Sequence, residues 1–141
     1  MNYYFLILGL SMIISGCAVT PATITPSARP IITSEAAEYR KITADQAKEK
    51  MDETADWVLL DVRTDEEFKE AHIENAILIP DDEISSRVET EIPNKNTIIF
   101  IYCRSGRRSA NAAYEMIDMG YTNVYDFGGI IDWPYETING E

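Results

Sequence analysis

The sequence predicts an α/β fold, in which a parallel sheet of buried strands carries helices on both faces. From residue 35 onward, apolar runs alternate with amphipathic stretches, the order expected for repeated strand–helix units. The runs at 57–62 and 97–102 are almost continuously apolar, which is typical of strands covered on both faces. A chain of 141 residues can hold one such domain together with additional segments.

Residues 1–16 are predicted to be a signal peptide of the lipoprotein type. Residues 3–14 are almost wholly apolar but fall short of the ~20 residues that a membrane-spanning helix needs. The following Ile14-Ser15-Gly16-Cys17 resembles a bacterial lipobox, in which small residues precede a cysteine that accepts diacylglycerol. The resemblance implies that Cys17 is lipidated and anchors an exported protein in the bacterial cell envelope. In a two-membrane bacterium, the outer membrane facing the periplasm is expected. An uncleaved signal anchor is the alternative.

Residues 17–34 are expected to be a tether, followed by the domain at 35–141. Residues 20–34 hold three of the six prolines and one charged side chain. Proline removes backbone donors and favours extended chain, so this segment is interpreted as a spacer. The alternative is that Ile31 and Ile32 begin the domain as an edge strand.

The first half of the domain is expected to contain three strands and two capped helix starts. Thr43 or Asp45 can cap a helix over residues 46–51. Thr64 and Glu67 have the spacing of a capping box. The three predicted strands are at 39–42, 57–62 and 75–80.

The second half is expected to contain two helices and two strands. A short helix at 84–88 precedes a strand at 97–102. A helix at 109–119 should place Ala110, Ala113 and Ile117 on one apolar face and stop at Gly120. The last strand is predicted at 124–127.

Three features fall at the carboxyl ends of predicted strands, where parallel sheets bind ligands. They are Asp61, Cys103 and the pair Gly128-Gly129. Asp61 is expected to support the loop after Cys103 by accepting a hydrogen bond. The alternative is that it caps the turn at Thr64 at the surface.

The segment Cys103–Ser109 holds three of the twelve basic residues in a chain of net charge −12. A loop that leads into a helix N-terminus directs its free N–H groups at one spot and favours an anion there. The pKa of the Cys103 thiol is therefore predicted to lie below its ordinary value. Gly106 permits a tight turn, including positive φ. The arginines of this loop are expected to bind the oxygens of an anionic substrate.

The sequence Tyr-Cys-Arg-Ser-Gly-Arg-Arg-Ser at 102–109 resembles the active-site loop of the single-domain bacterial rhodaneses. Similar signatures stand in the same order at 61–68, 71–80 and 127–133. The resemblance implies a rhodanese-like, five-stranded parallel sheet and a sulfurtransferase. Cys103 would take sulfur from a donor such as thiosulfate as a persulfide and pass it to cyanide or a thiol. No metal or organic cofactor is implied. The implied substrate-binding residues are Arg104, Ser105, Gly106, Arg107, Arg108 and Ser109.

Two positions depart from the family pattern, which usually has glycine at residues 71 and 75. Asn75 tolerates left-handed backbone, and Ala71 fits if its φ is negative.

Other functions remain open on the sequence. The domain could be a persulfide carrier or sulfide-binding module without turnover of its own. A phosphatase or arsenate reductase is less favoured, because related phosphatases place arginine six positions after the cysteine. Here Arg108 comes five positions after Cys103 and Ser109 comes sixth. A plain anion site, or a cysteine that only fills the core, are the remaining alternatives.

The expected partners are a small sulfur-containing anion as donor, and a thiol or a protein as acceptor. The acidic charge disfavours nucleic acid and anionic lipid surfaces, so membrane attachment would need the lipid on Cys17.

Overall fold

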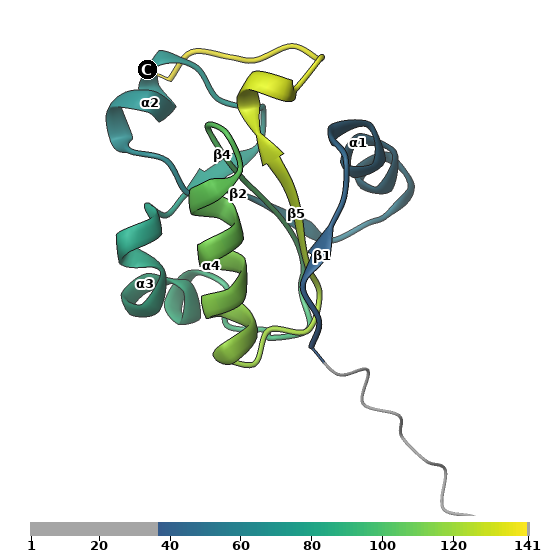
Figure 1. The fold of residues 1–141 in the computed structure, drawn as a ribbon, viewed down its shortest axis with the longest axis vertical. Coiled ribbons are helices and arrows are strands. Elements are labelled where there is room, and N and C mark those ends of the chain that lie inside the picture. Colours follow the sequence, from purple (N-terminus) through teal and green to yellow (C-terminus); the bar gives the residue numbers. More distant parts are fainter. Residues whose placement is uncertain (1–36, 141) are drawn as a thin grey trace, which may run out of the picture. The chain divides into compact units, whose positions relative to one another are not determined.

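The computed structural model describes residues 37–140. They form a five-stranded sheet in which every strand pair is parallel, and helices cover both faces (Figure 1). The predicted α/β class is therefore confirmed. The predicted signal peptide, Cys17 and the tether to residue 34 lie outside the described residues. Within residues 37–140, no helix combines the length and the apolarity needed to cross a membrane.

The strand order places the strand of Cys103 at the centre of the sheet. The order is β1-β5-β4-β2-β3. Because β4 lies between β2 and β5, the carboxyl end of β4 is flanked by Asp61 on one side and by Gly129 on the other. The strands are β1 (Arg40–Lys41), β2 (Trp57–Asp61), β3 (Ala76–Leu78), β4 (Ile98–Cys103) and β5 (Val124–Gly129).

Two capping boxes start the first two helices; the box at Thr64 was predicted, whereas for the first helix the sequence predicted only a cap by Thr43 or Asp45. Thr43 exchanges bonds with Gln46, and Thr64 does so with Glu67, which satisfies N–H groups that a helix start leaves open. The helices are α1 (Ala44–Glu53), α2 (Asp65–Glu70), α3 (Ile84–Glu91) and α4 (Arg107–Asp118). Single 3-10 turns, η1 (Asp81–Glu83) and η2 (Ile130–Asp132), precede α3 and follow β5.

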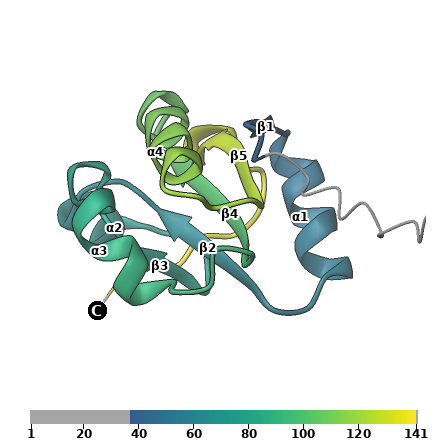
Figure 2. The same ribbon diagram turned by 90° about the horizontal axis from the view of Figure 1, so that it is seen from below.

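The helices divide the core into two layers. Figures 1 and 2 show α3 and α4 on one side of the strands and α1 on the other. Alternate residues of the central strands supply both layers. Leu60 and Ile101 pack in the α3–α4 layer, whereas Leu59 and Phe100 pack in the α1 layer. Full burial of such a side chain contributes about 1.5–3 kcal/mol.

Helix α4 begins two residues earlier than predicted and buries a different face. Ser109, Ala112, Ala113 and Met116 are buried, so of the predicted apolar face only Ala113 is fully covered. The prediction followed the spacing of apolar side chains alone and did not place polar Ser109 on the buried face. Instead, Ser109 points at the sheet, where a buried carboxylate bonds to its hydroxyl.

A β-bulge interrupts β5 beside the end of β4. Ile101 pairs with Asp126 and Tyr102 pairs with Gly128, so Phe127 is an additional residue on β5. Gly128 takes a φ of 93°, which glycine adopts without a Cβ penalty. Bulges re-aim side chains next to functional sites. The alternation of side chains along β5 places Phe127 in the α1 layer and Asp126 towards α4, and the bulge brings Gly128 opposite Tyr102.

Asn75 has a φ of 66° and Ala71 a φ of −164°. The backbone therefore accommodates both departures from the glycine pattern, as predicted.

Candidate active site

Cys103 is the last residue of β4, and the chain after it wraps around its sulfur. The residue is 1% exposed. Gly106, with a φ of 98°, is the N-cap of α4 and donates its N–H to the Cys103 Sγ at 3.0 Å. The loop and the first turn of α4 thus converge on one sulfur atom, as the sequence predicted. This is the geometry in which backbone amides hold an anion.

The thiolate form of Cys103 is favoured. Burial alone would raise the pKa of the thiol. The backbone N–H groups of Ser109, Gly106 and Ser105 outweigh that effect and hold the pKa below its ordinary value. The only histidine of the sequence does not act as a general base for the Cys103 thiol. His72 Nδ1 lies 2.9 Å from the carbonyl oxygen of Phe68, and its ring stacks on that of Phe68.

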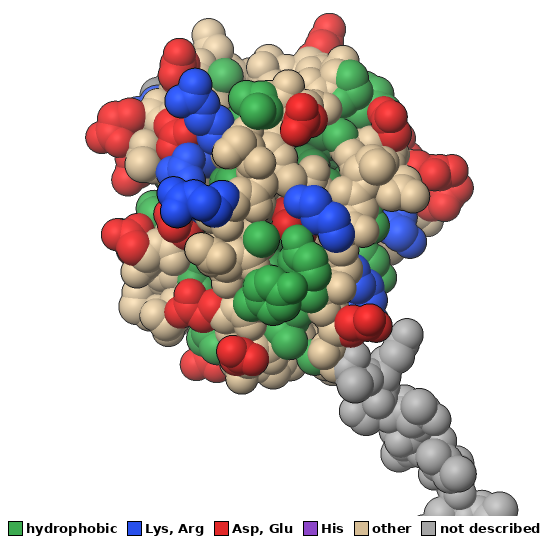
Figure 3. Space-filling view, in the orientation of Figure 1, with side chains coloured by type: hydrophobic (Ala, Val, Ile, Leu, Met, Phe, Trp, Pro, Cys, Tyr) green, Lys and Arg blue, Asp and Glu red, His purple; other side chains and the backbone are tan. Residues whose placement is uncertain are grey.

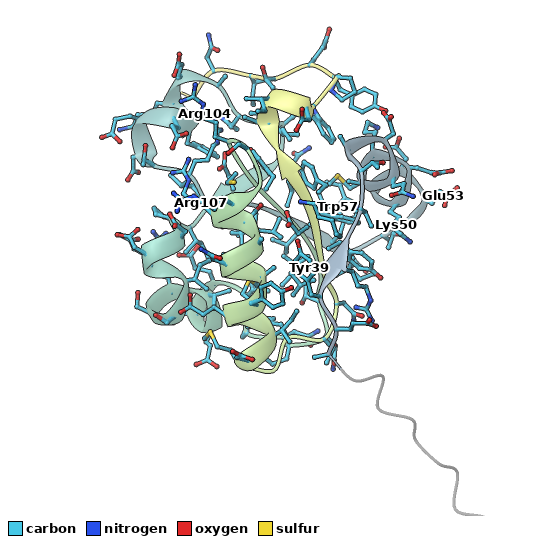
Figure 4. All side chains as sticks on the ribbon, viewed as in Figure 1. Tyr39, Lys50, Glu53, Trp57, Arg104 and Arg107 are labelled. Carbon is cyan, nitrogen blue, oxygen red and sulfur yellow. The ribbon has the colours of Figure 1, made fainter. Side chains whose placement is uncertain are left out.

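The three arginines of the loop have different surroundings. Arg104 and Arg107 are exposed, and among residues 37–140 neither pairs with a carboxylate. Figure 4 labels both at the loop end of the domain, and Figure 3 shows basic side chains gathered there. Arg108 is partly buried, and its Nη2 lies 2.8 Å from the Glu67 carboxylate on α2. Arg104 and Arg107 are thus placed to meet an anion, and Arg108 joins α4 to α2.

Asp61 does not contact the loop after Cys103. Its buried carboxylate accepts bonds from the Arg63 N–H at 3.0 Å and from the Arg63 Nη2 at 2.6 Å. Arg63 also donates to the carbonyl oxygen of Ala71. Asp61 therefore braces the turn between β2 and α2. Asp61 lies at the expected edge of the sheet, but its carboxylate forms an ion pair with Arg63, two residues further along the chain. The alternative of a surface cap does not describe it either, because both residues are buried.

The carboxylate that supports the loop is that of Asp126, which sequence reasoning missed. Asp126 Oδ1 accepts the Ser109 hydroxyl at 2.8 Å and the Gly128 N–H at 2.9 Å. Its Oδ2 accepts Lys41 Nζ at 3.0 Å and the Tyr39 hydroxyl at 2.6 Å. One signal was available in the sequence. A lone acidic residue inside the apolar run at 124–129 indicates a buried charge, which needs partners.

Gly129 allows β5 to pass directly under the loop. A Cβ at this position would lie 2.2 Å from the carbonyl oxygen of Arg104 and 2.7 Å from the Ser105 Cα. No side chain fits that space without moving the loop. The glycine pair of β5 therefore belongs to the site, as its position at the sheet edge predicted.

A cleft of about 440 Å³ opens beside the loop. Arg104 and Glu70 line it together with the apolar side chains of Ile130 and Ile131. Arg104, the residue after Cys103, is the loop residue that reaches the cleft. Among the described residues, no group of acidic, histidine or cysteine side chains has the arrangement of a metal site.

Comparisons with known proteins agree with this geometry. The family model of the rhodanese-like domain matches residues 43–134. The chain is 37% identical over 81 residues to thiosulfate sulfurtransferase PspE of Escherichia coli, covering 57% of this chain and 78% of that protein. It is 36% identical over 106 residues to YrkF of Bacillus subtilis, a proposed sulfur carrier protein, covering 74% of this chain and 56% of YrkF.

Among solved structures, a rhodanese with anions from E. coli superimposes with a TM-score of 0.56 at 36% identity. The match covers 59% of this chain and 98% of that one. Since the family model spans more than half of the chain and the fold and cysteine loop agree with it, this chain belongs to the rhodanese-like domain family.

Proposed function

We propose that this protein is a sulfurtransferase that carries sulfane sulfur on Cys103. The observation that carries the proposal is the Cys103 sulfur at the focus of the loop amides, with two exposed arginines beside it. Amides that stabilise a thiolate also stabilise the terminal sulfur of a persulfide, which is likewise an anion. The names of the relatives, a thiosulfate sulfurtransferase and a proposed sulfur carrier, support the same chemistry.

The proposed reaction has two displacement steps. In the first, the Cys103 thiolate attacks the outer sulfur of thiosulfate. A bond forms between the two sulfurs, the original sulfur–sulfur bond breaks, and sulfite leaves with the bonding electron pair. Arg104 and Arg107 bind the donor oxygens. In the second step, cyanide or a thiolate attacks the outer sulfur of the persulfide. Thiocyanate or a new persulfide leaves, and the Cys103 thiolate is restored. Neither step needs a cofactor, and the loop amides, which lower the pKa of the Cys103 thiol, favour the thiolate without a general base.

The test uses the full chain in a Cys17→Ser background, so that Cys103 is its sole thiol. Intact mass is measured before and after brief exposure to thiosulfate. We expect a gain of one sulfur atom, removal of that sulfur by cyanide with formation of thiocyanate, and no gain in Cys103→Ser. A mass gain with polysulfide but not with thiosulfate would support the persulfide on Cys103 and show that thiosulfate is not the donor. No gain from either donor contradicts the proposal, and cysteine-dependent turnover of an aryl phosphate would then favour a phosphatase.

A persulfide carrier is the second candidate, and two observations favour it. One relative is a proposed sulfur carrier protein, and Cys103 is 1% exposed, which restricts access of small acceptors. A carrier would load sulfur once but would not turn over on small thiols. Multiple turnovers with cyanide or a small thiol would exclude it.

The proposal includes attachment to the cell envelope. The apolar segment and the lipobox-like Ile14-Ser15-Gly16-Cys17 support cleavage before Cys17, lipidation of that cysteine and a tether over residues 17–34. In a two-membrane bacterium, the domain would face the periplasm from the outer membrane.

A further inference from the structure

The strongest unexplained feature near the site is the set of donors around Asp126. The residue is fully buried, and four donors from three elements meet its carboxylate. Tyr39 and Lys41 come from the segment of β1, Ser109 from the first turn of α4, and Gly128 from the bulge of β5. Lys41 and Asp126 are 85 positions apart in the sequence. A buried carboxylate with so many partners fixes the relative position of all the elements it joins.

Lys41 also lies against the active-site loop itself. A Cβ on Gly106 would be 3.5 Å from Lys41 Nζ, and a Cβ on Gly128 would be 3.2 Å from it. The ammonium group therefore packs on the backbone of two glycines, one of which donates to the Cys103 sulfur. The absence of side chains at Gly106 and Gly128 leaves the space that the ammonium occupies.

Ser109 connects this ion pair to the sulfur. A hydroxyl has one proton, and the charged Asp126 at 2.8 Å is a stronger acceptor than the carbonyl oxygens of Gly106 and Gly128, both at 3.2 Å. The bond to Asp126 thus fixes the position of Ser109 in the first turn of α4, where its backbone N–H opposes the effect of burial on the pKa of the Cys103 thiol. Without a cation beside it, the buried Asp126 charge would act against a neighbouring thiolate.

We propose that Lys41 and Asp126 form a positioning pair, in which Asp126 holds Ser109 against the Cys103 sulfur and Lys41 balances the charge of Asp126. The pair acts through Ser109 and touches no substrate. The inference deepens the proposed sulfur transfer, on which its functional meaning rests. It assigns a role in the site to a residue of the edge strand β1, at the opposite end of the domain sequence from Asp126.

Other charges face the sulfur or the pair. The charged groups are the exposed Arg104 and Arg107 of the loop, and Arg108 with its partner Glu67 and with Asp81 nearby; Tyr39 is a neutral hydroxyl that donates to Asp126. A variant of Lys41 leaves all of these in place. A change in the pH dependence of Cys103 alkylation after substitution of Lys41 is therefore due to the loss of the Lys41–Asp126 pair.

The test compares the rate of alkylation of Cys103 by iodoacetamide against pH, in full chains with Cys17→Ser. Lys41→Met removes the ammonium. Lys50→Met is the matched control, because it removes the same charge from α1, where Lys50 lies over the Tyr125 ring (Figure 4). Lys41→Arg keeps the charge. Lys41→Gln keeps a hydrogen-bond donor without the charge. It replaces Lys41→Met if urea titrations show that Lys41→Met is not folded.

We expect the alkylation midpoint of Lys41→Met to rise by about half a pH unit, which means roughly threefold less thiolate below the midpoint. The alkylation midpoint of Lys50→Met should equal that of the parent. The midpoint of Lys41→Arg should lie close to that of the parent, because the positive charge is kept. Equal profiles for Lys41→Met and the parent, or equal rises in Lys41→Met and Lys50→Met, would overturn the inference. Sulfur uptake by the parent is measured in parallel. If the parent takes up no sulfur, the sulfurtransferase proposal fails, while the alkylation profiles still decide the role of Lys41.

Discussion

At the residue scale, three residues near Cys103 determine the surroundings of its sulfur. Gly106, Ser109 and Gly129 each contribute something different: an N–H on the sulfur, a hydroxyl tied to Asp126, and the room for the loop to pass. Of these, Gly129 tolerates the least change, because the contact it would make is with backbone and not with a mobile side chain.

Replacement of Gly129 by alanine should therefore displace the loop. We expect Gly129→Ala to abolish sulfur uptake and to lower the free energy of unfolding by about 1–3 kcal/mol, the usual cost of overpacking. Gly120→Ala is the control. Gly120 has a φ of 96° but meets nothing within 4 Å, so alanine there should cost about 1 kcal/mol through backbone strain alone. Urea titrations and intact mass after thiosulfate exposure provide both measurements. Uptake at the parent level in Gly129→Ala would show that the loop does not depend on this contact.

The two exposed arginines are expected to act on the donor and not on the fold. Arg104→Gln and Arg107→Gln should each raise the KM for thiosulfate roughly three- to tenfold, since each loses one charge-assisted contact at an exposed site. The KM for an uncharged sulfane donor should change much less. Steady-state kinetics with both donors check this, and equal effects on the two would remove the oxygen-binding role.

At the scale of elements, the Arg108–Glu67 pair ties the start of α4 to the start of α2. Glu67 also closes the capping box with Thr64. Burial would raise the pKa of Glu67, but the bonds from Arg108 and from the Thr64 N–H outweigh it, so the pKa lies below its ordinary value. A carboxyl with a lowered folded-state pKa stabilises the protein above the unfolded-state value of about 4.3. That contribution disappears as the pH falls through the folded-state pKa.

Glu67→Gln should thus lower the free energy of unfolding at pH 7 by up to about 1 kcal/mol, because the pair is partly exposed. The difference from the parent should shrink as the pH is lowered from 7 towards 3, because the parent's Glu67 carboxylate is then increasingly protonated. Urea unfolding at the two pH values measures it, with Glu53→Gln on α1 as the control for one lost negative charge (Figure 4). A difference of equal size at both pH values would mean that the charge of Glu67 is not what stabilises the fold.

The elements themselves could be predicted because their signals are local. Apolar runs indicated the strands, and a capping residue near Thr43 and the capping box at Thr64 indicated helix starts. The cysteine loop could be identified for the same reason. The role of Asp126 could not, because it depends on the pairing of β1 with β5 and on a bulge that no short stretch of sequence specifies. The buried side of α4 was predicted wrongly because apolar spacing alone does not show that Ser109 has a buried partner in a distant strand.

At the scale of the whole molecule, a chain of net charge −12 presents a local basic surface around its nucleophile. The proposed lipid on Cys17 would keep that surface at a membrane without requiring attraction to anionic lipid. Metabolic labelling with a fatty-acid analogue should mark the full chain and should be lost in Cys17→Ser, whereas Cys103→Ser should be labelled like the parent. Unchanged labelling of Cys17→Ser would contradict the lipoprotein proposal.

The pairing of β1 with β5 also has a consequence for the time course of synthesis. Lys41 is among the first residues of the domain to be made, and Asp126, Gly128 and Gly129 are among the last. Until β5 has been synthesised and has inserted between β1 and β4, Ser109 has no carboxylate to orient it. A nascent chain should therefore carry an ordinary thiol of low nucleophilicity at neutral pH. The full reactivity of Cys103 would appear only on completion of the sheet.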